Sequence, residues 1–311
     1  MIESQVIADS ISPEGVRIIT WQNRYPKFIH GEKMTHRVFS RSASSSRAVP
    51  TQVLIAEARS DDLRAVPVRW GKHQAGMQAF QDLEGDDLEK AKLLWRDAAL
   101  AAADRAEKMA ALGAAKQIVN RILEPYTHIN SVWTATHLRN FFGLRLHKDA
   151  DPTMQAIANA MFEAMKSSTP RPIVFGDWHL PYVTKRLYGA DLVALAMKDV
   201  PLEAQIKVSV ARCARVSYKS FETGATPTLE EDLKLYDRLV GAQPIHAGPA
   251  EHQATPDKDD QSSYGRRPIW RSPQLHGNFE GWVQYRKMLP GEAIAPLPEG
   301  YEWPVLEGFT G

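Results

Sequence analysis

The sequence has almost no cysteine and almost no net charge. Cys213 is the single cysteine among 311 residues, so a disulfide framework and a zinc site made of thiolates are excluded, and a reducing compartment is expected. The 38 lysines and arginines are balanced by 37 aspartates and glutamates, which gives a net charge of +1. No overall field would therefore attract nucleic acid or an acidic membrane, and any anion must be bound by a local group of side chains.

Long apolar runs and the common catalytic motifs are also absent. No window approaches the length of about eighteen apolar residues that a membrane helix needs, and the start MIESQVIADSISPEG does not resemble a signal peptide, so we expect a soluble, cytoplasmic protein. There is no glycine-rich phosphate loop, no H-E-x-x-H and no G-x-S-x-G. His128, His137 and His147 are separated by nine and ten residues, which does not set two of them on one helical face, and we expect no metal site.

Helical periodicity is present over much of the chain. Hydrophobic residues make up 43% of it, which is enough to bury a core. Apolar residues recur at steps of three and four, and Thr228 with Glu231 forms the pattern of a capping box. The predicted helices run from about Asp86 to Gly113, over Lys116 to Leu123, from near Thr134 through HLRNFFGLR, over roughly Thr153 to Ser167, and from Thr228 to near Gly241.

Strand patterns are fewer. VRIITW and KFIHGEKM are predicted as strands on either side of a tight turn at Asn23 to Pro26. IKVSVARCARVSY alternates with period two, which predicts a strand with Ile206, Val208 and Val210 on one face. Prolines become frequent after Gly241, so we expect residues 1–311 to form a single domain that residues 242–311 wrap, with an anchor in NFEGWVQYRKML.

The run THRVFSRSASSSR at residues 35–47 is polar and cannot build a core. It is either a disordered, phosphorylatable linker or a loop whose hydroxyls and guanidiniums bind an anion. Further arginines lie in predicted helices, Arg121 in NRILEP and Arg139 and Arg145 in HLRNFFGLR. Any one helical arginine is most often a solvated surface residue.

These residues carry a resemblance to a known family. H-R-x-x-S followed by S-x-R resembles the signature R-H-R-x-x-S-x-N-E-x-S-x-R-Y of the flavin-dependent thymidylate synthases. The matching positions are His36, Arg37, Ser40, Ser45 and Arg47. NRILEP is similar to the family's arginine four residues before a proline, and TATHLRNFFGLR with ADPTMQAI resembles the helix and the segment that follow in the family. There Asn140 and Arg145 match, and Thr134 replaces an asparagine.

Two further family blocks stand in an unusual order. ARVSY (214–218) and HAGPAEH (246–252) resemble blocks that usually precede the signature, but here they follow it. The chain is therefore identified as a circularly permuted member, an order that phage-encoded members of the family share. A permuted order is physically acceptable because a core depends on spatial neighbours and chain termini often lie close together.

The resemblance implies both a fold and a reaction. The fold is α/β (α+β), a twisted, mostly antiparallel sheet packed with a helical bundle, in homotetramers whose sites draw on several subunits. The reaction is the reductive methylation of dUMP to dTMP, with methylenetetrahydrofolate as the carbon donor and FAD, reduced by NADPH, as the hydride donor. No protein nucleophile is needed, since the cofactor carries the difficult chemistry.

The resemblance also assigns residues. Arg145 is the catalytic residue, whose guanidinium stabilises the uracil anion across N3 and a carbonyl oxygen. Substrate binding falls to Glu32, Ser44, Ser45, Ser46, Arg47, Arg121 and Arg145, with the arginines and serines supplying charge-assisted bonds to the phosphate. Cofactor binding falls to His36, Arg37, Ser40, Thr134, Asn140, Ser217, His246 and Glu251.

Departures from the family pattern keep two alternatives open. Thr35, Ala43 and Ala48 replace an arginine, a glutamate and a tyrosine, so the nucleotide pocket loses a cation and a carboxylate. A sister enzyme, a flavin-dependent hydroxymethylase that converts dUMP to 5-hydroxymethyl-dUMP, would end without the hydride step. A more distant alternative treats SRSASSSR as an arginine-serine segment that binds RNA.

Overall fold

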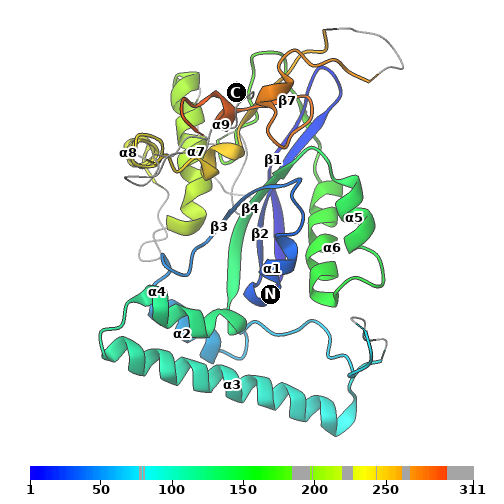
Figure 1. Cartoon of the computed structure of the whole chain (residues 1–311), viewed down its shortest axis with the longest axis vertical. Coiled ribbons are helices and arrows are strands. Elements are labelled where there is room, and N and C mark those ends of the chain that lie inside the picture. The colour runs from blue at the N-terminus through cyan, green and yellow to red at the C-terminus, as the bar shows by residue number, and fades with distance from the viewer. Residues whose placement is uncertain are drawn as a thin grey trace, which may run out of the picture.

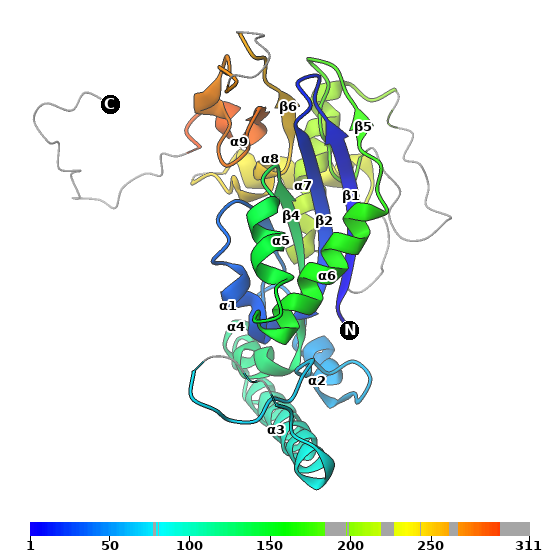
Figure 2. The same ribbon diagram turned by 90° about the vertical axis from the view of Figure 1, so that its right-hand side faces the viewer.

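A central sheet with helices on both faces organises the molecule (Figure 1). The computed structural model describes residues 1–76, 79, 81–183, 197, 199–218, 227–242, 244–260 and 267–292, and gives only the backbone for 217 and 218. Helices α5 (Arg139–Arg145) and α6 (Pro152–Lys166) cover one face of the sheet, and α7 (Leu202–Tyr218) and α8 (Leu229–Val240) lie on the other side (Figure 2). A second group of helices lies at one end of the strands. The expected mixed fold with a helical bundle is confirmed.

The sheet has five strands in the order β3-β4-β2-β1-β5. The strands are β1 (Glu3–Ile11), β2 (Arg17–Pro26), β3 (Ser40–Ala43), β4 (His128–Ala135) and β5 (Arg171–Pro172). All neighbouring pairs are antiparallel except β1 and β5. The β1–β2 hairpin closes through a loop in which Gly15 has φ +78°, a conformation that glycine adopts without strain, and Ser12 accepts from the amide of Val16 at 3.1 Å.

Two strand predictions need correction at the N-terminal end. VRIITW does belong to β2, but β2 continues through Asn23 to Pro26, where a turn was expected. KFIHGEKM forms a 3-10 turn, η1 (Lys27–Ile29), and a short helix, α1 (His30–Lys33), in place of a strand. The run is too short for hydrophobic spacing to separate helix from strand. The antiparallel partners of β2 are β1 and β4, and neither was predicted as a strand from the sequence.

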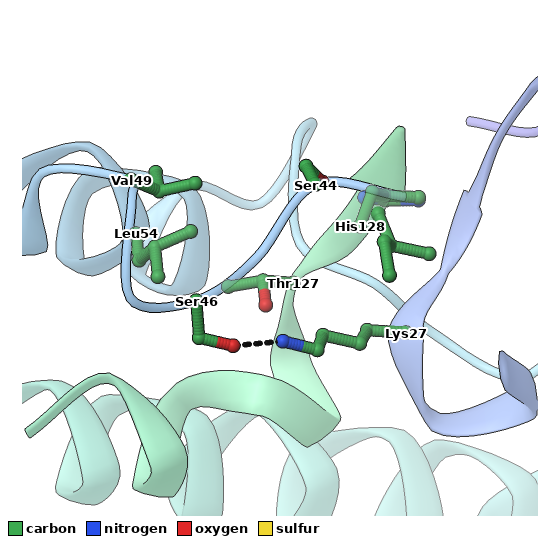
Figure 3. Close-up of a pocket in the computed structure, with 8 residues that line it drawn as sticks. Lys27, Ser44, Ser46, Val49, Leu54, Thr127 and His128 are labelled. Atoms are coloured by element: carbon green, nitrogen blue, oxygen red, sulfur yellow. Dashed lines mark hydrogen bonds between the residues drawn. The ribbon is translucent and has the colours of Figure 1, made fainter. Parts of the chain in front are cut away.

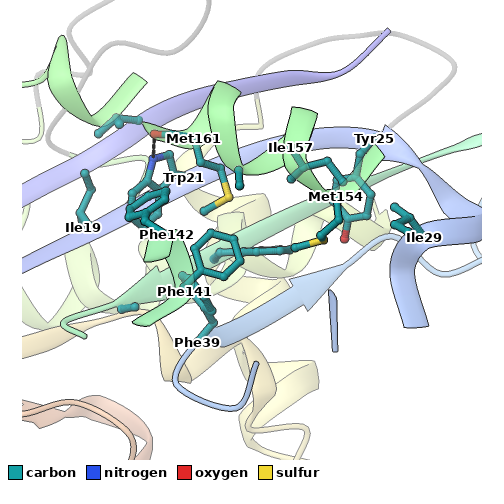
Figure 4. Packing of buried hydrophobic residues seen from close by; sticks show 14 of the residues in the cluster. Ile19, Trp21, Tyr25, Ile29, Phe39, Phe141, Phe142, Met154, Ile157 and Met161 are labelled. Atoms are coloured by element: carbon teal, nitrogen blue, oxygen red, sulfur yellow. Dashed lines mark hydrogen bonds between the residues drawn. The ribbon is translucent and has the colours of Figure 1, made fainter. Parts of the chain in front are cut away.

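The main core lies between the sheet and helices α5 and α6 (Figure 4). Trp21, on β2, is fully buried, and its indole nitrogen donates to the carbonyl of Met161 on α6 at 3.1 Å. The N-terminus of α6 is capped by Asp151, whose carboxylate accepts from the amides of Thr153 and Met154, so the predicted helix from 153 to 167 is confirmed. The preceding helix was predicted to begin near Thr134 and begins instead at Arg139, because residues 128–135 form β4.

The predicted strand IKVSVARCARVSY is wrong, since these residues form all of α7 after its first four residues. Ile206, Val210 and Cys213 are spaced as on one helical face, yet Val208 and Ala211 are buried too. A helix packed between a sheet and a second helix is apolar around most of its circumference, which hides the 3.6-residue period. The following helix, α8, is confirmed with its capping box: Thr228 accepts from the amide of Glu231 at 3.2 Å, and Glu231 accepts from the amide of Thr228 at 2.8 Å.

The helices at the end of the sheet form a separate cluster. They are α2 (Thr51–Arg59), α3 (Gly85–Ala111), α4 (Lys116–Val119) and the 3-10 segment η2 (Asn120–Tyr126). The long helix α3 confirms the prediction for 86–113 and buries Ala99, Ala103 and Ala106. The predicted helix over 116–123 is α-helical only to Val119, after which the chain tightens into η2 and passes Pro125.

The C-terminal segment crosses the tip of the β1–β2 hairpin. Its elements are η3 (Gly248–Glu251), β6 (Ala254–Pro256), η4 (Pro273–Leu275), β7 (Trp282–Gln284) and α9 (Tyr285–Met288). Within the predicted anchor, Phe279 and Trp282 are buried, and the Trp282 indole donates to the carbonyl of Val16 at 3.2 Å. In the part of the chain that the structure describes, no helix has both the length and the apolar character needed to cross a bilayer.

Candidate functional site

The middle of the polar run at 35–47 belongs to the sheet. Residues 40–43 pair with β4 as strand β3, and Ser44 extends this pairing. The Ser44 amide donates to the carbonyl of Asn130 at 2.8 Å, and its hydroxyl accepts from the Asn130 amide at 3.1 Å. Ser45 caps the next turn by accepting from the amide of Arg47, whose side chain is exposed. These contacts exclude a disordered linker.

A first polar cluster forms around Glu124. This residue accepts from the Lys27 ammonium at 2.8 Å and from Arg121 Nη1 at 3.3 Å, both through the same oxygen, Oε1. The Ser46 hydroxyl donates to that oxygen. It also accepts from the Lys27 ammonium (Figure 3). Asn120 holds the serine loop by donating to the carbonyl of Ser46 at 2.6 Å.

A small cavity lies behind this cluster. Its volume is about 10 Å³, which admits about one water molecule and is far below the several hundred Å³ of a nucleotide pocket. It is lined by Lys27, Ser44, Ser46, Val49, Leu54, Thr127, His128 and Ile129 (Figure 3). The outer side of the cluster is more open, since Arg121 is 64% exposed there.

A second cluster forms around Arg145. Its Nε donates to Nε2 of His36 at 2.6 Å, and the imidazole packs edge-on against Phe141. Burial lowers the pKa of His36, and the Arg145 charge lowers it further, so this histidine stays neutral and accepts through Nε2. Burial raises the pKa of Glu32, the neighbouring Asp151 adds to the rise, and Arg145 opposes it. The catalytic arginine expected from the sequence thus lies near the carboxylate of Glu32 and beside a neutral imidazole.

His30, in helix α1, lies near charges of the Glu124 cluster and near Arg41 of β3. The pKa of His30 is lowered to about 4, first by burial and then by Lys33, Lys27 and Arg41, whereas Glu124 opposes the shift. Its Nδ1 lies 2.8 Å from the hydroxyl of Tyr25. Charges of the Glu124 cluster and of the β3 side therefore act on one imidazole between them.

The structure brings together only some of the predicted residues. Glu32, His36 and Arg145 form one group, and Ser46 and Arg121 belong to the other, but the three arginines have no shared partner within the described chain. Arg37, Arg47, Asn140 and His246 are exposed. Ser40 is buried between Asn278 and Gln284, and Glu251 pairs with Arg286. Ser217 lies in the last turn of α7, and its side chain falls outside the described residues.

Sequence reasoning missed three polar residues of these clusters, Lys27, Arg41 and Glu124. Lys27 was predicted to lie in a strand. Glu124 lies within NRILEP, but no role was predicted for it. Arg41 stands at an unspecified position of the family signature, yet it donates to the carbonyls of Met34 at 2.7 Å and His36 at 3.3 Å. The signal that could have found Lys27 is Pro26 before it, which ends a central strand and turns the next residue towards the serine loop.

A chain of buried hydrogen bonds crosses the opposite face of the sheet. Thr134, expected at the cofactor, is fully buried in this chain and hydrogen-bonds both Thr20, at 2.7 Å, and His252, at 2.9 Å. The links run from Ser10 to His179 (3.0 Å), His179 to Thr20 (2.8 Å), Thr20 to Thr134, Thr134 to His252, and His252 to Ser42 (3.0 Å). The segment after η3 is thereby fixed to β3 and β4.

These buried histidines predict acid sensitivity. Burial lowers the pKa of both His179 and His252 to about 3, whereas each would titrate near 6.5 in the unfolded chain. Below pH 6.5 the unfolded state binds protons that the folded state excludes, so stability is full above about pH 6.5 and declines as the pH falls towards 3. We expect each histidine to remove about 2 kcal/mol at pH 5.

Urea unfolding at about pH 7.5 and about pH 5 measures this effect. The variant His252→Asn removes one titrating group, so its stability should fall less steeply between the two pH values than that of the native chain. Equal unfolding free energies of the native chain at both pH values would contradict the prediction.

The two family blocks that follow the signature in the chain lie beside it in space. Helix α7, which carries ARVSY, packs against β3 and β4, and η3, which belongs to HAGPAEH, contacts both α7 and β3. Gln284 ties this arrangement together by donating to the carbonyl of Glu251 and to Ser40, each at 3.1 Å. Within the described residues, no three side chains of the kinds that bind metals gather closely enough to hold an ion.

Comparisons with known proteins identify a family. The model of the family described as thymidylate synthase complementing protein matches residues 16–171, which is half of the chain and includes both clusters. Among solved structures, the UMP/dUMP methylase PolB from Streptomyces cacaoi bound with 5-Br UMP is 17% identical, with a TM-score of 0.44, and the match covers 53% of this chain and 88% of that one. Thymidylate synthase X from Helicobacter pylori with FAD and dUMP is 18% identical, with a TM-score of 0.32, and covers 48% and 67%. No curated protein matches the chain.

Proposed function

Because the chain belongs to the thymidylate synthase complementing protein family, the flavin-dependent thymidylate synthases, we propose that it methylates dUMP to dTMP. It is a flavin-dependent thymidylate synthase-like enzyme that modifies dUMP. In the proposed reaction, methylenetetrahydrofolate supplies the carbon and reduced FAD supplies the hydride. The observation that best supports the proposal is the Arg145–His36 pair, which presents a guanidinium at the edge of the sheet.

The chemistry requires a uracil ring made nucleophilic at C5. We assign to Arg145 the stabilisation of the ring when its N3 proton is lost or shared. His36 engages only Nε of this guanidinium, and within the described residues neither terminal nitrogen of Arg145 has a hydrogen-bond partner. These two nitrogens form a planar pair of donors that matches N3 and a carbonyl oxygen. Because His36 is neutral, it orients the guanidinium without adding a competing charge.

The residues around β3 fit a flavin dinucleotide. Its pyrophosphate needs cations, and two arginines lie close together there: burial lowers the pKa of Arg41, Glu251 and Tyr25 oppose this, and Arg37 lowers the pKa further. Adjacent like charges are stabilised by an anion between them. Arg37 and Asn140 are exposed and available for such contacts. When bound, FAD would supply the hydride, while these residues would hold and orient it.

We further propose NADPH as the reductant and a homotetramer as the working assembly. Helix α3 supports assembly, because Leu93 and Leu94 on it are 53% and 69% exposed. Light scattering coupled to gel filtration would measure the assembly directly. A phage-encoded origin and a place in the host cytoplasm are part of the same proposal.

One incubation tests the proposed reaction. The chain is mixed with FAD, dUMP and methylenetetrahydrofolate, with and without NADPH, and the nucleotide product is identified by mass. We expect dTMP, formed only with the reductant, and a flavin absorbance band that stays with the purified protein. 5-Hydroxymethyl-dUMP would instead establish the hydroxymethylase alternative, which the loss of charged residues at Thr35 and Ala43 favours. An unchanged dUMP would contradict both.

A further inference from the structure

We propose that Lys27 is an additional ligand for the nucleotide phosphate and that Glu124 occupies this phosphate site while it is empty. This inference rests on the proposed function, because it concerns the phosphate of the same substrate. Its ligand class is a phosphate monoester dianion. Binding would displace the Glu124 carboxylate, which makes this side chain a built-in competitor of the substrate.

The geometry around Glu124 is that of an occupied anion site. Lys27 Nζ at 2.8 Å, Arg121 Nη1 at 3.3 Å and the Ser46 hydroxyl all point to the one oxygen Oε1. The three donors come from η1, η2 and the loop between β3 and α2, which are far apart in the sequence. An ammonium, a guanidinium and a hydroxyl that converge on a single oxygen form a set that suits a phosphate oxygen equally well.

The charge balance favours exchange of the carboxylate for a phosphate. Lys27 and Arg121 carry two positive charges, whereas Glu124 supplies one negative charge, and the exposed Arg47 adjoins Ser46 in the chain. A phosphate dianion would balance this excess better than one carboxylate. The dianion and Glu124 would repel each other at such short range, so both cannot share the three donors.

The burial of Lys27 explains why the Glu124 carboxylate occupies the site when no substrate is bound. The Lys27 side chain is only 15% exposed, and a poorly hydrated ammonium without a counter-ion is costly. The Lys27 amide donates to the carbonyl of Thr127 at 2.9 Å, so the backbone holds this ammonium near the cluster whether or not substrate is bound. The Glu124 side chain is 24% exposed, so in this proposal a side-chain rotation is enough for it to leave the donors.

Two substitutions with opposite expected effects test the proposal. Glu124→Gln removes the competing charge, and we expect dUMP to bind on the order of tenfold more tightly. Lys27→Met removes a charged donor, and we expect binding to weaken on the order of tenfold or more. Matched controls are Glu89→Gln and Lys92→Met, an exposed pair with a 2.8 Å contact on α3, which should bind dUMP as the native chain does.

The measurement is calorimetric titration of the full FAD-loaded chain with dUMP, deoxyuridine and inorganic phosphate. Deoxyuridine lacks the phosphate, so its affinity should be the same in Glu124→Gln, Lys27→Met and the native chain. Equal dUMP affinities in all variants, or parallel changes for dUMP and deoxyuridine, would overturn the inference and leave the proposed function intact. The melting temperature of Lys27→Met must also lie as close to the native value as those of the two control variants. If Lys27→Met is less stable than this, the test rests on Glu124→Gln alone.

The phosphate titration keeps the two proposals separate. If the native chain binds no dUMP, the proposed function fails, and inorganic phosphate still decides the inference. Tighter phosphate binding by Glu124→Gln than by the native chain, together with weaker binding by Lys27→Met, supports the site. If Glu124→Gln and Lys27→Met bind inorganic phosphate with the same affinity, or if neither binds it, the proposed site is overturned.

Discussion

Replacement of Arg145 by lysine is expected to lower the turnover of dUMP by on the order of 10²- to 10³-fold while FAD stays bound. Lysine keeps the charge but loses the planar pair of terminal donors, and its ammonium cannot donate to His36 and to two ring atoms in one plane. His36 would also lose the hydrogen bond that Arg145 makes at 2.6 Å. Single-turnover formation of dTMP, followed beside the flavin absorbance, measures both effects.

The matched control for this substitution lies on the same helix. Arg139 begins α5, six residues before Arg145, and is exposed. Arg139→Lys should therefore turn over dUMP at the native rate. Native turnover by Arg145→Lys would remove this residue from its proposed role, and loss of flavin from the same variant would indicate a structural defect instead.

Replacement of Asp232 by asparagine is expected to cost about 3 to 5 kcal/mol of stability. Asp232 is fully buried between α7 and α8 and accepts from Arg212 Nε at 2.8 Å and from Arg215 Nε at 2.9 Å. Asparagine has the same shape but no charge, so two guanidiniums would be left without a counter-ion, one of them in a side chain that is only 6% exposed.

Urea unfolding measures this loss against a neighbour on the same helix. Asp237 is exposed on α8, and Asp237→Asn should change the free energy of unfolding by no more than about 0.5 kcal/mol. An Asp232→Asn variant as stable as this control would show that the two arginines find other partners or water. The arginine pair would then not depend on the shared carboxylate.

The sequence predicted those elements whose signals are local. Helix α8 carries its capping box within four residues, and α6 begins at an aspartate followed by a proline. Helix α7 was mistaken for a strand because burial on several sides erased its period. The strand β1 gave no sufficient local signal, since its identity depends on pairing with β2.

The sequence predicted several residues of the candidate site but not which of them contact one another. The family signature located His36 and Arg145, which are 109 residues apart, without indicating that they touch. Ser46 and Glu124 are 78 residues apart, and no local pattern connects a serine loop to the carboxylate before Pro125. Thr134 shows the reverse case, because a position expected at the cofactor is buried among hydroxyl and imidazole groups. Contacts of this kind arise from tertiary packing alone.

The hydrogen-bonded chain through His179 and His252 has a consequence for synthesis on the ribosome. Strands β1 to β4 are complete once residue 135 has been made, but Thr20 and Thr134 receive their imidazole partners only from residues 179 and 252. In a nascent chain that ends before His252, the Thr134 hydroxyl therefore lacks its imidazole partner on a face of the sheet that is buried in the finished protein. The finished sheet must await the last quarter of translation, and truncated chains are expected to be recognised by chaperones.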